Sequence, residues 1–119
     1  MNVVVIGASD NPERYSNMAV RLLKEKGHTV FPVHQRIKMV EGLTVYSSIT
    51  HVPQVIDTVS LYVAADISSA LSQDILAQKP RRIIFNPGAE NAQLAGLARQ
   101  QGIIVQDACT LVLLRTGQF

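Results

Sequence analysis

The chain has 119 residues, of which 47% are hydrophobic and only 17% are charged, whereas charged residues make up about 25% of an average globular domain. This length fits one domain over residues 1–119, which would bury roughly two-thirds of its unfolded surface. Apolar runs such as "TLVLL" are far shorter than the roughly 20 residues that cross a bilayer. No basic start precedes a cleavable apolar stretch, so we expect a cytoplasmic protein with no membrane partner.

The charged and reactive residues argue against a nucleic-acid-binding protein and against a disulfide-bonded or metal-binding one. Residues 1–40 hold six of the 11 Lys and Arg residues and three of the nine acids. The positive charge that gives the chain its net charge of +2 therefore lies in this part. Nucleic-acid-binding domains combine dense basic surface with aromatic residues that stack on bases. Aromatic residues are 5% of this chain and Trp is absent, so we expect no nucleic-acid partner. Cys109 is the only cysteine and the three histidines stand apart, which predicts neither a disulfide nor a metal site.

The first elements are a strand, a polar loop, a helix and a second strand. "NVVVIG" at 2–7 is a β-branched run of the kind buried on both faces of a parallel sheet. A helix is expected from Ser16 to Lys26, with Ser16 as its N-cap and Gly27 as the residue that ends it. "HTVFPV" at 28–33 follows as the second strand.

The rest of the chain continues this alternation. Three further strands are expected at "TVSLYVA" (58–64), "RRIIFN" (81–86) and "GIIVQDA" (102–108). Two amphipathic helices are expected between them, over 66–79 with Asp66 as the cap and over 90–102. Residues 37–57 are less regular, with a turn expected near Gly42 and one helical turn from Ser48 to Val52.

Alternating strands and helices force parallel pairing with right-handed crossovers. We therefore expect an α/β fold of three layers, a doubly wound Rossmann-like fold with a five-stranded parallel sheet in the order 3-2-1-4-5. Ligands bind such sheets beyond the carboxyl ends of the strands, where the strand order reverses. The site is therefore expected between the loop after the first strand, "GASDNPERYSN", and the loop after the fourth, "NPGAEN".

The first loop resembles a dinucleotide-binding turn but has a single glycine. Gly7 allows a sharp exit from the strand, and the two further glycines of the dinucleotide fingerprint are absent. Backbone N–H groups and the hydroxyls of Ser9 and Ser16 are expected to face an anion near the helix N-terminus. The alternative is that Ser9 and Ser16 only cap turns and that nothing binds.

The end of the second strand carries bases where an NAD-binding protein has an acid. An Asp or Glu there would accept the ribose hydroxyls of NAD, but this chain has Arg36 and Lys38. Both suit a 2′- or 3′-phosphate on an adenosine, although two basic residues in a loop are also compatible with simple solvation. His34 either stacks on adenine or is exposed, and we expect exposure.

Longer stretches resemble a known family. "VVVIGASDNPERYSN", then "FPV" with a basic residue three positions later, "GLTVYSSITHVPQVIDTVSLYV" and "IIFNPGAEN" are together similar to the stand-alone CoA-binding domain family. That family is related to the N-terminal domain of the succinyl-CoA synthetase alpha subunit. The resemblance runs almost from end to end, and its most specific part is the combination of "GAS", the following "SN" and "GLTVYSSI".

The resemblance implies that the ligand is coenzyme A or an acyl-CoA. With the charges noted above, the residues expected to bind it are Gly7, Ala8, Ser9, Asn11, Arg14, Ser16, Asn17, Pro32, Val33, Arg36, Lys38 and Val63. By the family pattern the first loop and Arg36 meet phosphates, Pro32 and Val33 lie on the adenine side, and Val63 lies in the pantetheine groove. The family has Val-Asn-Pro and a basic residue where this chain has Val33-His34-Gln35-Arg36.

No pattern predicts catalysis. Cys109 has no histidine near it in sequence to activate a thiolate. Asp107 could serve as a base, and Glu90 is expected in the first turn of a helix, where an acid stabilises the helix dipole. The phosphorylated histidine of the synthetase lies in a second domain that this sequence does not contain, so ligase activity is not implied.

We therefore expect a small CoA-binding protein that is not catalytic by itself. One alternative is a small NADP-dependent oxidoreductase, or a nucleotide-sugar enzyme, that uses the same basic pair. Another is a subunit that assembles with copies of itself or with a partner protein through the apolar segment "ACTLVLLRTGQF".

Overall fold

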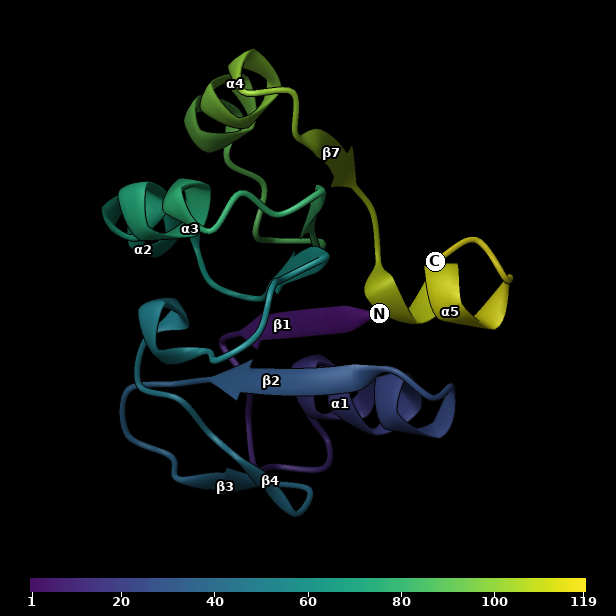
Figure 1. The fold of residues 1–119 in the computed structure, drawn as a ribbon. Coiled ribbons are helices and arrows are strands. Elements are labelled where there is room, and N and C mark those ends of the chain that lie inside the picture. Colours follow the sequence, from purple (N-terminus) through teal and green to yellow (C-terminus); the bar gives the residue numbers. More distant parts are fainter.

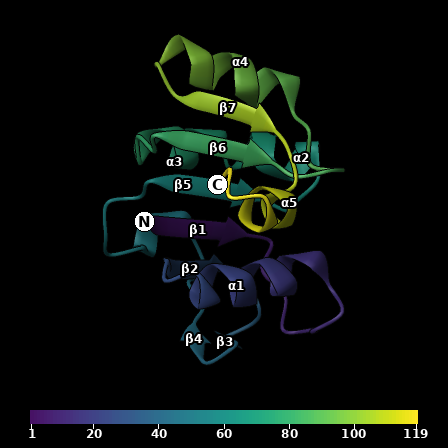
Figure 2. The same ribbon diagram turned by 90° about the vertical axis from the view of Figure 1, so that its right-hand side faces the viewer.

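The computed structural model describes residues 1–119. The protein folds around one parallel sheet of five strands. Its strands are β1 (Asn2–Ile6), β2 (Thr29–Val33), β5 (Thr58–Leu61), β6 (Arg82–Phe85) and β7 (Ile104–Asp107). They lie in the order β2-β1-β5-β6-β7, all parallel. The arrowheads in Figure 2 accordingly point to the same edge of the sheet, which we call the carboxyl edge.

Helices cover both faces of this sheet. Figure 1 shows α1 (Tyr15–Glu25) and α5 (Thr110–Arg115) on one side, and α2 (Ala65–Ala70), α3 (Ser72–Ala77) and α4 (Ala92–Gln100) on the other. The doubly wound Rossmann-like fold with a five-stranded parallel sheet is therefore confirmed. None of the helices is long and apolar enough to cross a membrane.

The third expected strand lies on the other side of the first strand from the second. This strand is β5, which pairs with β1 and with β6, so the five expected strands run 2-1-3-4-5. The position outside β2 is taken by the stretch around Tyr46, which exchanges backbone hydrogen bonds with Pro32 and His34 (N···O 2.9 and 3.0 Å). If this stretch is counted as a rudimentary third strand, the order becomes 3-2-1-4-5-6, which contains the expected 3-2-1-4-5 arrangement around the first strand. The loop opposite the first loop is consequently the one after β5, and not "NPGAEN".

The connection from β2 to β5 contains the expected turn near Gly42, which joins two short strands that were not predicted, and the expected helical turn. Strands β3 (Met39–Val40) and β4 (Leu43–Thr44) pair antiparallel across a turn at Glu41 and Gly42. A 3₁₀ turn, η1 (Ile49–His51), follows, with the Ser48 hydroxyl accepting a hydrogen bond from the N–H of Thr50. The hairpin lies beyond β2 at the end of the molecule opposite α4 (Figure 1).

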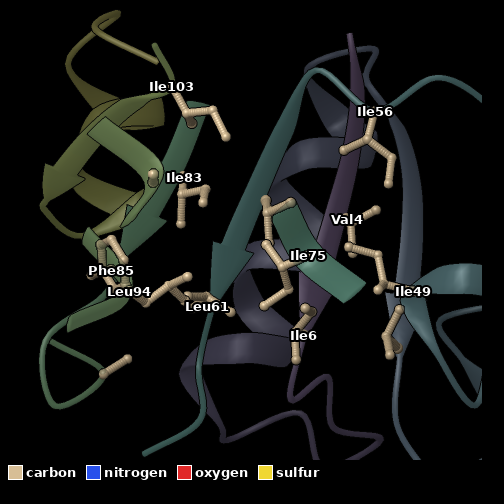
Figure 3. Close-up of a cluster of buried hydrophobic side chains, with 14 of the residues drawn as sticks. Val4, Ile6, Ile49, Ile56, Leu61, Ile75, Ile83, Phe85, Leu94 and Ile103 are labelled. Carbon is tan, nitrogen blue, oxygen red and sulfur yellow. The ribbon is translucent and has the colours of Figure 1, made fainter. Parts of the chain in front are cut away.

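The core consists of two layers of apolar side chains, one on each face of the sheet. Alternate residues of each strand point to opposite faces, so Val4 and Ile6 face α3 while Val3 and Val5 face α1. Figure 3 shows the larger layer, in which side chains of the strands meet Ile75 and Leu94 from the helices. Full burial of an aliphatic side chain of this size stabilises the fold by about 1.5–3 kcal/mol.

The ends of α1 differ in how well they were predicted. The helix begins at Tyr15 with Arg14 as its N-cap, so the expected N-cap role of Ser16 is wrong, and Ser16 is buried within the first turn. At the other end, Gly27 has φ +88°, and its N–H and that of His28 bond the carbonyls of Lys24 and Leu23 (both 3.0 Å). This pattern is a Schellman motif, which confirms that Gly27 ends the helix.

The segment expected as one helix over 66–79 forms two. Helix α2 ends at Ala70 and α3 begins at Ser72, because Leu71 (φ −95°, ψ 0°) interrupts the regular hydrogen bonding. Asp66 lies in the first turn of α2, and the N-cap position belongs to Ala64. Asp66 is therefore not the cap that the sequence predicted.

The last two helices also depart from expectation. The Asn91 side chain caps α4 by accepting a hydrogen bond from the N–H of Leu94 (3.0 Å). Glu90 consequently precedes α4, where its carboxylate accepts from the N–H of Gly88 (2.9 Å), and does not lie in the first turn as expected. The apolar C-terminal segment, for which no helix was predicted, contains α5.

Candidate functional site

A groove of two adjoining cavities opens at the carboxyl edge of the sheet. The first cavity, here called the polar lobe, has a volume of about 700 Å³, and the second, the apolar lobe, about 560 Å³. Both are lined by Gly7, His34, Val63 and Ile67, so the two lobes are continuous. Sites for cofactors and other small molecules have volumes of this order. The groove lies next to the loop that was expected to bind phosphate.

Gly7 shapes the floor of the groove. Its φ of +86° is a left-handed conformation, and a Cβ built there would lie 2.9 Å from Cγ1 of Val63 and 3.0 Å from the carbonyl oxygen of Tyr62. The N–H groups of Gly7 and Ala8 both bond the carbonyl of Val33 (3.1 and 3.3 Å). Glycine is therefore required where the chain turns tightly after β1, between the ends of β2 and β5. Because the N–H groups of Gly7 and Ala8 are already hydrogen-bonded, they are not available to a ligand.

The first turn of α1 supplies the free donors. The N–H groups of Tyr15, Ser16 and Asn17 have no partner within the chain, and no side chain caps this helix. Tyr15 and Ser16 line the polar lobe, as does Arg14. Unpaired N–H groups at a helix N-terminus attract anions, so this lobe can hold a phosphate group.

The loop between β1 and α1 is held rigid by its own side chains. Ser9 Oγ accepts from the N–H of Asn11, and Asn11 Oδ1 accepts from the N–H of Glu13 (both 3.0 Å). The Ser9 hydroxyl keeps its own proton free to donate, and Ser9 lines the polar lobe. Asn11 does not line either lobe, so the structure gives it a role in the shape of the loop.

Asn17 lies behind the loop and not in the groove. It is completely buried, and its Nδ2 donates to the carbonyl of Ser9 (2.9 Å) while its Oδ1 accepts from Nε of Arg21 (2.9 Å). Arg21 also donates to the carbonyl of Pro12 (2.8 Å). Together Asn17 and Arg21 fix the two halves of the loop on α1.

The apolar lobe lies between the end of β2 and α2. Its apolar walls are Ile6, Val33, Ile49, Val63, Ile67 and Leu71. Arg36 lines the same lobe beside Ser47 and Ser48. Of the other residues predicted for this end of the ligand, Pro32 is buried within β2 and Lys38 is exposed, and neither lines the groove.

His34 holds the turn after β2. Its Nδ1 accepts from the N–H groups of Arg36 and Ile37 (3.0 and 3.2 Å), so in the neutral ring the proton lies on Nε2. The side chain is half-buried and lines both lobes, and the expected exposure of His34 is therefore corrected. The imidazole therefore restrains the turn that follows β2.

The opposite wall of the groove was largely missed from the sequence. It is formed by Tyr62, Val63 and Ala64 after β5 and by Ile67 of α2, of which only Val63 was predicted. Residues 58–64 looked like a continuous strand, so the end of β5 at Leu61 was hidden. No residue of "NPGAEN" lines either lobe.

The reactive side chains lie outside the groove or are buried. Burial raises the pKa of the Tyr62 hydroxyl far above its usual value, and this hydroxyl has no hydrogen-bond partner. Cys109 is half-buried before α5, and neither Cys109, Asp107 nor Glu90 lines a lobe. No group of three or more His, Cys, Asp or Glu side chains is arranged to hold a metal ion.

Comparison with protein families gives a match over nearly the whole chain. A family model described as "CoA binding domain" matches residues 1–115. The uncharacterized protein YneT of Bacillus subtilis (strain 168) is 22% identical over 111 residues, which cover 92% of this chain and 82% of YneT.

Several solved structures share the fold of this chain. One crystal structure of an uncharacterized protein is 36% identical, covers 99% of this chain and 97% of its own, and superposes with a TM-score of 0.89. A hypothetical protein from Pyrococcus horikoshii OT3 is 24% identical, with 96% and 81% covered and a TM-score of 0.91. The dinucleotide-forming acetyl-coenzyme A synthetase 1 of Ca. Korarchaeum cryptofilum is 22% identical, with 87% of this chain and 25% of the synthetase covered and a TM-score of 0.73. The last two likenesses show the fold alone.

Proposed function

Since this chain belongs to the CoA-binding domain family, we propose that it binds coenzyme A, or an acyl-CoA, in the two-lobed groove and has no catalytic activity by itself. One observation carries the proposal. The unpaired N–H groups of the first turn of α1 open onto a polar lobe that continues into an apolar lobe beside Arg36. A ligand with a diphosphate joined to an adenosine phosphate matches this succession of donors, apolar wall and cation.

In this proposal the diphosphate lies at the N-terminus of α1. The N–H groups of Tyr15 and Ser16 and the hydroxyl of Ser9 donate to it, and Arg14, which lines the same lobe, adds a positive charge. Charge-assisted hydrogen bonds of this kind are shorter and stronger than neutral ones. Asn11, Asn17 and Ala8 support the loop, and the pantetheine arm passes Val63.

The adenosine lies in the apolar lobe. Adenine packs between Val33 and Ile49, and the guanidinium of Arg36 meets the 3′-phosphate, because these groups line one cavity. Pro32 contributes by fixing the end of β2, and Lys38, which lies outside the groove, adds positive charge to the loop that carries Arg36. NADP carries its phosphate on the 2′ oxygen of a similar adenosine, so it is the competing ligand.

The interpretation of the C-terminal segment as a partner-binding surface has less support. Leu111, Leu113 and Leu114 of α5 are buried within the chain, and Val112 is the large apolar residue of this helix that is exposed (52%). Packing against the sheet therefore accounts for most of the apolar character of the segment. Assembly with a second copy or a partner stays an alternative, and a cytoplasmic location stays a prediction.

Ligand titration tests this function. We expect CoA to raise the Tm of the purified protein more than NADP or NAD does, because a ligand that binds only the native state stabilises it by about 2.7 kcal/mol at a hundredfold excess over Kd. Native mass spectrometry of protein purified from cells should also detect a bound CoA mass. A shift in Tm with NADP and none with CoA would move the assignment to a NADP-dependent protein.

A further inference from the structure

The loop that lines the polar lobe is connected to the β3–β4 hairpin. The side-chain amide of Asn17 has two hydrogens, and one is donated to the carbonyl of Ser9 while the other is donated to Oε2 of Glu41 (3.3 Å). Glu41 lies in the hairpin turn and lines neither lobe of the groove. The carboxylate therefore acts on the loop only through the buried amide of Asn17.

The backbone at Glu41 is strained. Glu41 has φ +50° and Gly42 has φ +76°, which is the pattern of a two-residue type I′ turn. Such turns strongly prefer Asn or Gly at the first position, and a Glu there is held at a cost in free energy. The carbonyl of Glu41 is in turn held by Nζ of Lys24 on α1 (2.6 Å). The residue is thus fixed at both its backbone and its carboxylate, at a position where another residue type would be more stable.

We propose that Glu41 is a positioning residue for the loop between β1 and α1. Its carboxylate orients the Asn17 amide, which holds the Ser9 carbonyl and thereby the direction of the Ser9 side chain and of the loop backbone toward the groove. The effect on ligand affinity rests on the proposed function, because it assumes that the loop contacts the diphosphate of CoA. The effect on the loop itself does not depend on that assumption.

Three variants separate a positioning role from a purely structural one. Glu41→Asn provides the Asn-Gly sequence that a type I′ turn prefers, but its side chain is one carbon shorter and loses the contact with Asn17. Glu41→Gln keeps both the backbone strain and an acceptor oxygen that reaches Asn17. Lys79→Asn is the matched control, because Lys79 also has a left-handed φ (+49°) but follows α3 and lines neither lobe.

We expect Glu41→Asn to move stability and affinity in opposite directions. Its Tm should equal or exceed that of the wild type, whereas its affinity for CoA, measured by calorimetry, should fall roughly two- to tenfold, the value of one hydrogen bond. Glu41→Gln should restore the affinity. Lys79→Asn should raise the Tm without a change in affinity.

A second readout uses the protein without ligand. ¹⁵N relaxation of the backbone amides of Ala8, Ser9 and Asp10 should show greater mobility in Glu41→Asn than in the wild type or Glu41→Gln. If Glu41→Asn leaves both affinity and loop mobility unchanged, the positioning role is overturned. If the wild type does not bind CoA, the proposed function fails, and the relaxation comparison still decides the role of Glu41.

Discussion

At the scale of single residues, the groove depends on positions where the backbone leaves room for one residue type only. Gly7 is such a position, since a Cβ there would meet both Val63 and the backbone of Tyr62. Arg36 is different, because its backbone is unremarkable and its importance lies in charge at the rim of the apolar lobe. Gly7 therefore predicts that an added side chain would clash beside the groove, whereas Arg36 predicts that a phosphate group of the ligand is recognised by its charge.

Gly7→Ala is expected to lower both stability and CoA affinity. Gly88→Ala is a matched control, because Gly88 has a similar φ (+90°) but no atom within 4 Å of an added Cβ. Both substitutions carry the cost of a left-handed conformation, about 1–2 kcal/mol, and only Gly7→Ala adds a steric clash beside the groove. Thermal unfolding and CoA titration of the two variants measure the difference. Equal losses of stability with unchanged affinity in both would contradict the fit at Gly7.

Arg36→Ala is expected to abolish a preference for CoA over dephospho-CoA. A charge-assisted hydrogen bond to the 3′-phosphate is worth about 1.5–3 kcal/mol, so the wild type should prefer CoA roughly 10- to 100-fold at low salt, and less as salt screens the charges. Lys38→Ala should keep most of this preference, because Lys38 does not line the groove. Calorimetric titration of both ligands into each variant provides the comparison. An undiminished preference in the double variant would show that the phosphate is recognised elsewhere, with Arg14 as the next residue to test.

At the scale of elements, one buried side chain joins two helices beside the groove. Asn91 caps α4 and also donates to the carbonyl of Ala65 and to the hydroxyls of Ser68 and Ser69 on α2 (3.1, 2.7 and 3.0 Å). Helix α2 carries Ile67, which lines both lobes. The position of that wall of the groove therefore depends on the start of another helix.

Asn91→Ala is expected to cost about 1–3 kcal/mol of stability, because it removes the cap of α4 and the buried hydrogen bonds of the Asn91 amide to α2. Glu90→Ala, at the adjacent exposed residue, should stay within about 0.5 kcal/mol of the wild type. Urea unfolding of both variants measures the two values. A cost at Glu90 equal to that at Asn91 would mean that the dipole of α4, and not its cap, controls stability here.

At the scale of the whole molecule, three distant parts of the chain meet at the amino-terminal edge of the sheet. The ring of Phe119 lies 5.2 Å from that of His28 and covers the guanidinium of Arg82, whose Cζ is 4.3 Å from the ring centroid. Arg82 is almost completely buried (4% exposed) and donates to the Phe119 carbonyl (2.8 Å). Burial, followed by nearby positive charges that include Arg82, lowers the pKa of His28 below its usual value.

This lowered pKa predicts a loss of stability in acid. Because the pKa of His28 is lower in the folded state than in the unfolded state, its contribution is fully present above the unfolded value of about 6.5 and is lost as the pH falls through the folded value. The Tm should therefore fall less between pH 7.5 and 5 in His28→Gln than in the wild type. The exposed His51 provides the control variant, His51→Gln. An equal acid-induced decrease in all three proteins would contradict the prediction.

The sequence alone determined the elements and one side of the site. Apolar periodicity located all five strands of the sheet, and the turn at Gly42 and the end of α1 at Gly27 were confirmed, because these features depend on residues that are neighbours in the chain. The N-caps of the helices were less well predicted. Ser16 and Asp66 are residue types that often cap helices, but packing decides which residue occupies the N-cap position. Gly7, Ser9 and Arg36 were identified from local chemistry, and the structure brings them to one groove.

Only the tertiary structure decided which residues face the loop between β1 and α1 and which residues hold this loop in place. The position of β5 beside β1 made Tyr62 and Ile67 the opposite wall in place of "NPGAEN", and strand order is set by contacts between residues far apart in the chain. Asn17 looked like a ligand contact, yet its amide points to Glu41, 24 residues away in sequence. His34 was expected to be exposed, but two backbone N–H groups fix its ring between the lobes. A local pattern shows which side chains can bind a ligand, whereas the direction in which each one points depends on hydrogen bonds and packing that exist only once the chain has folded.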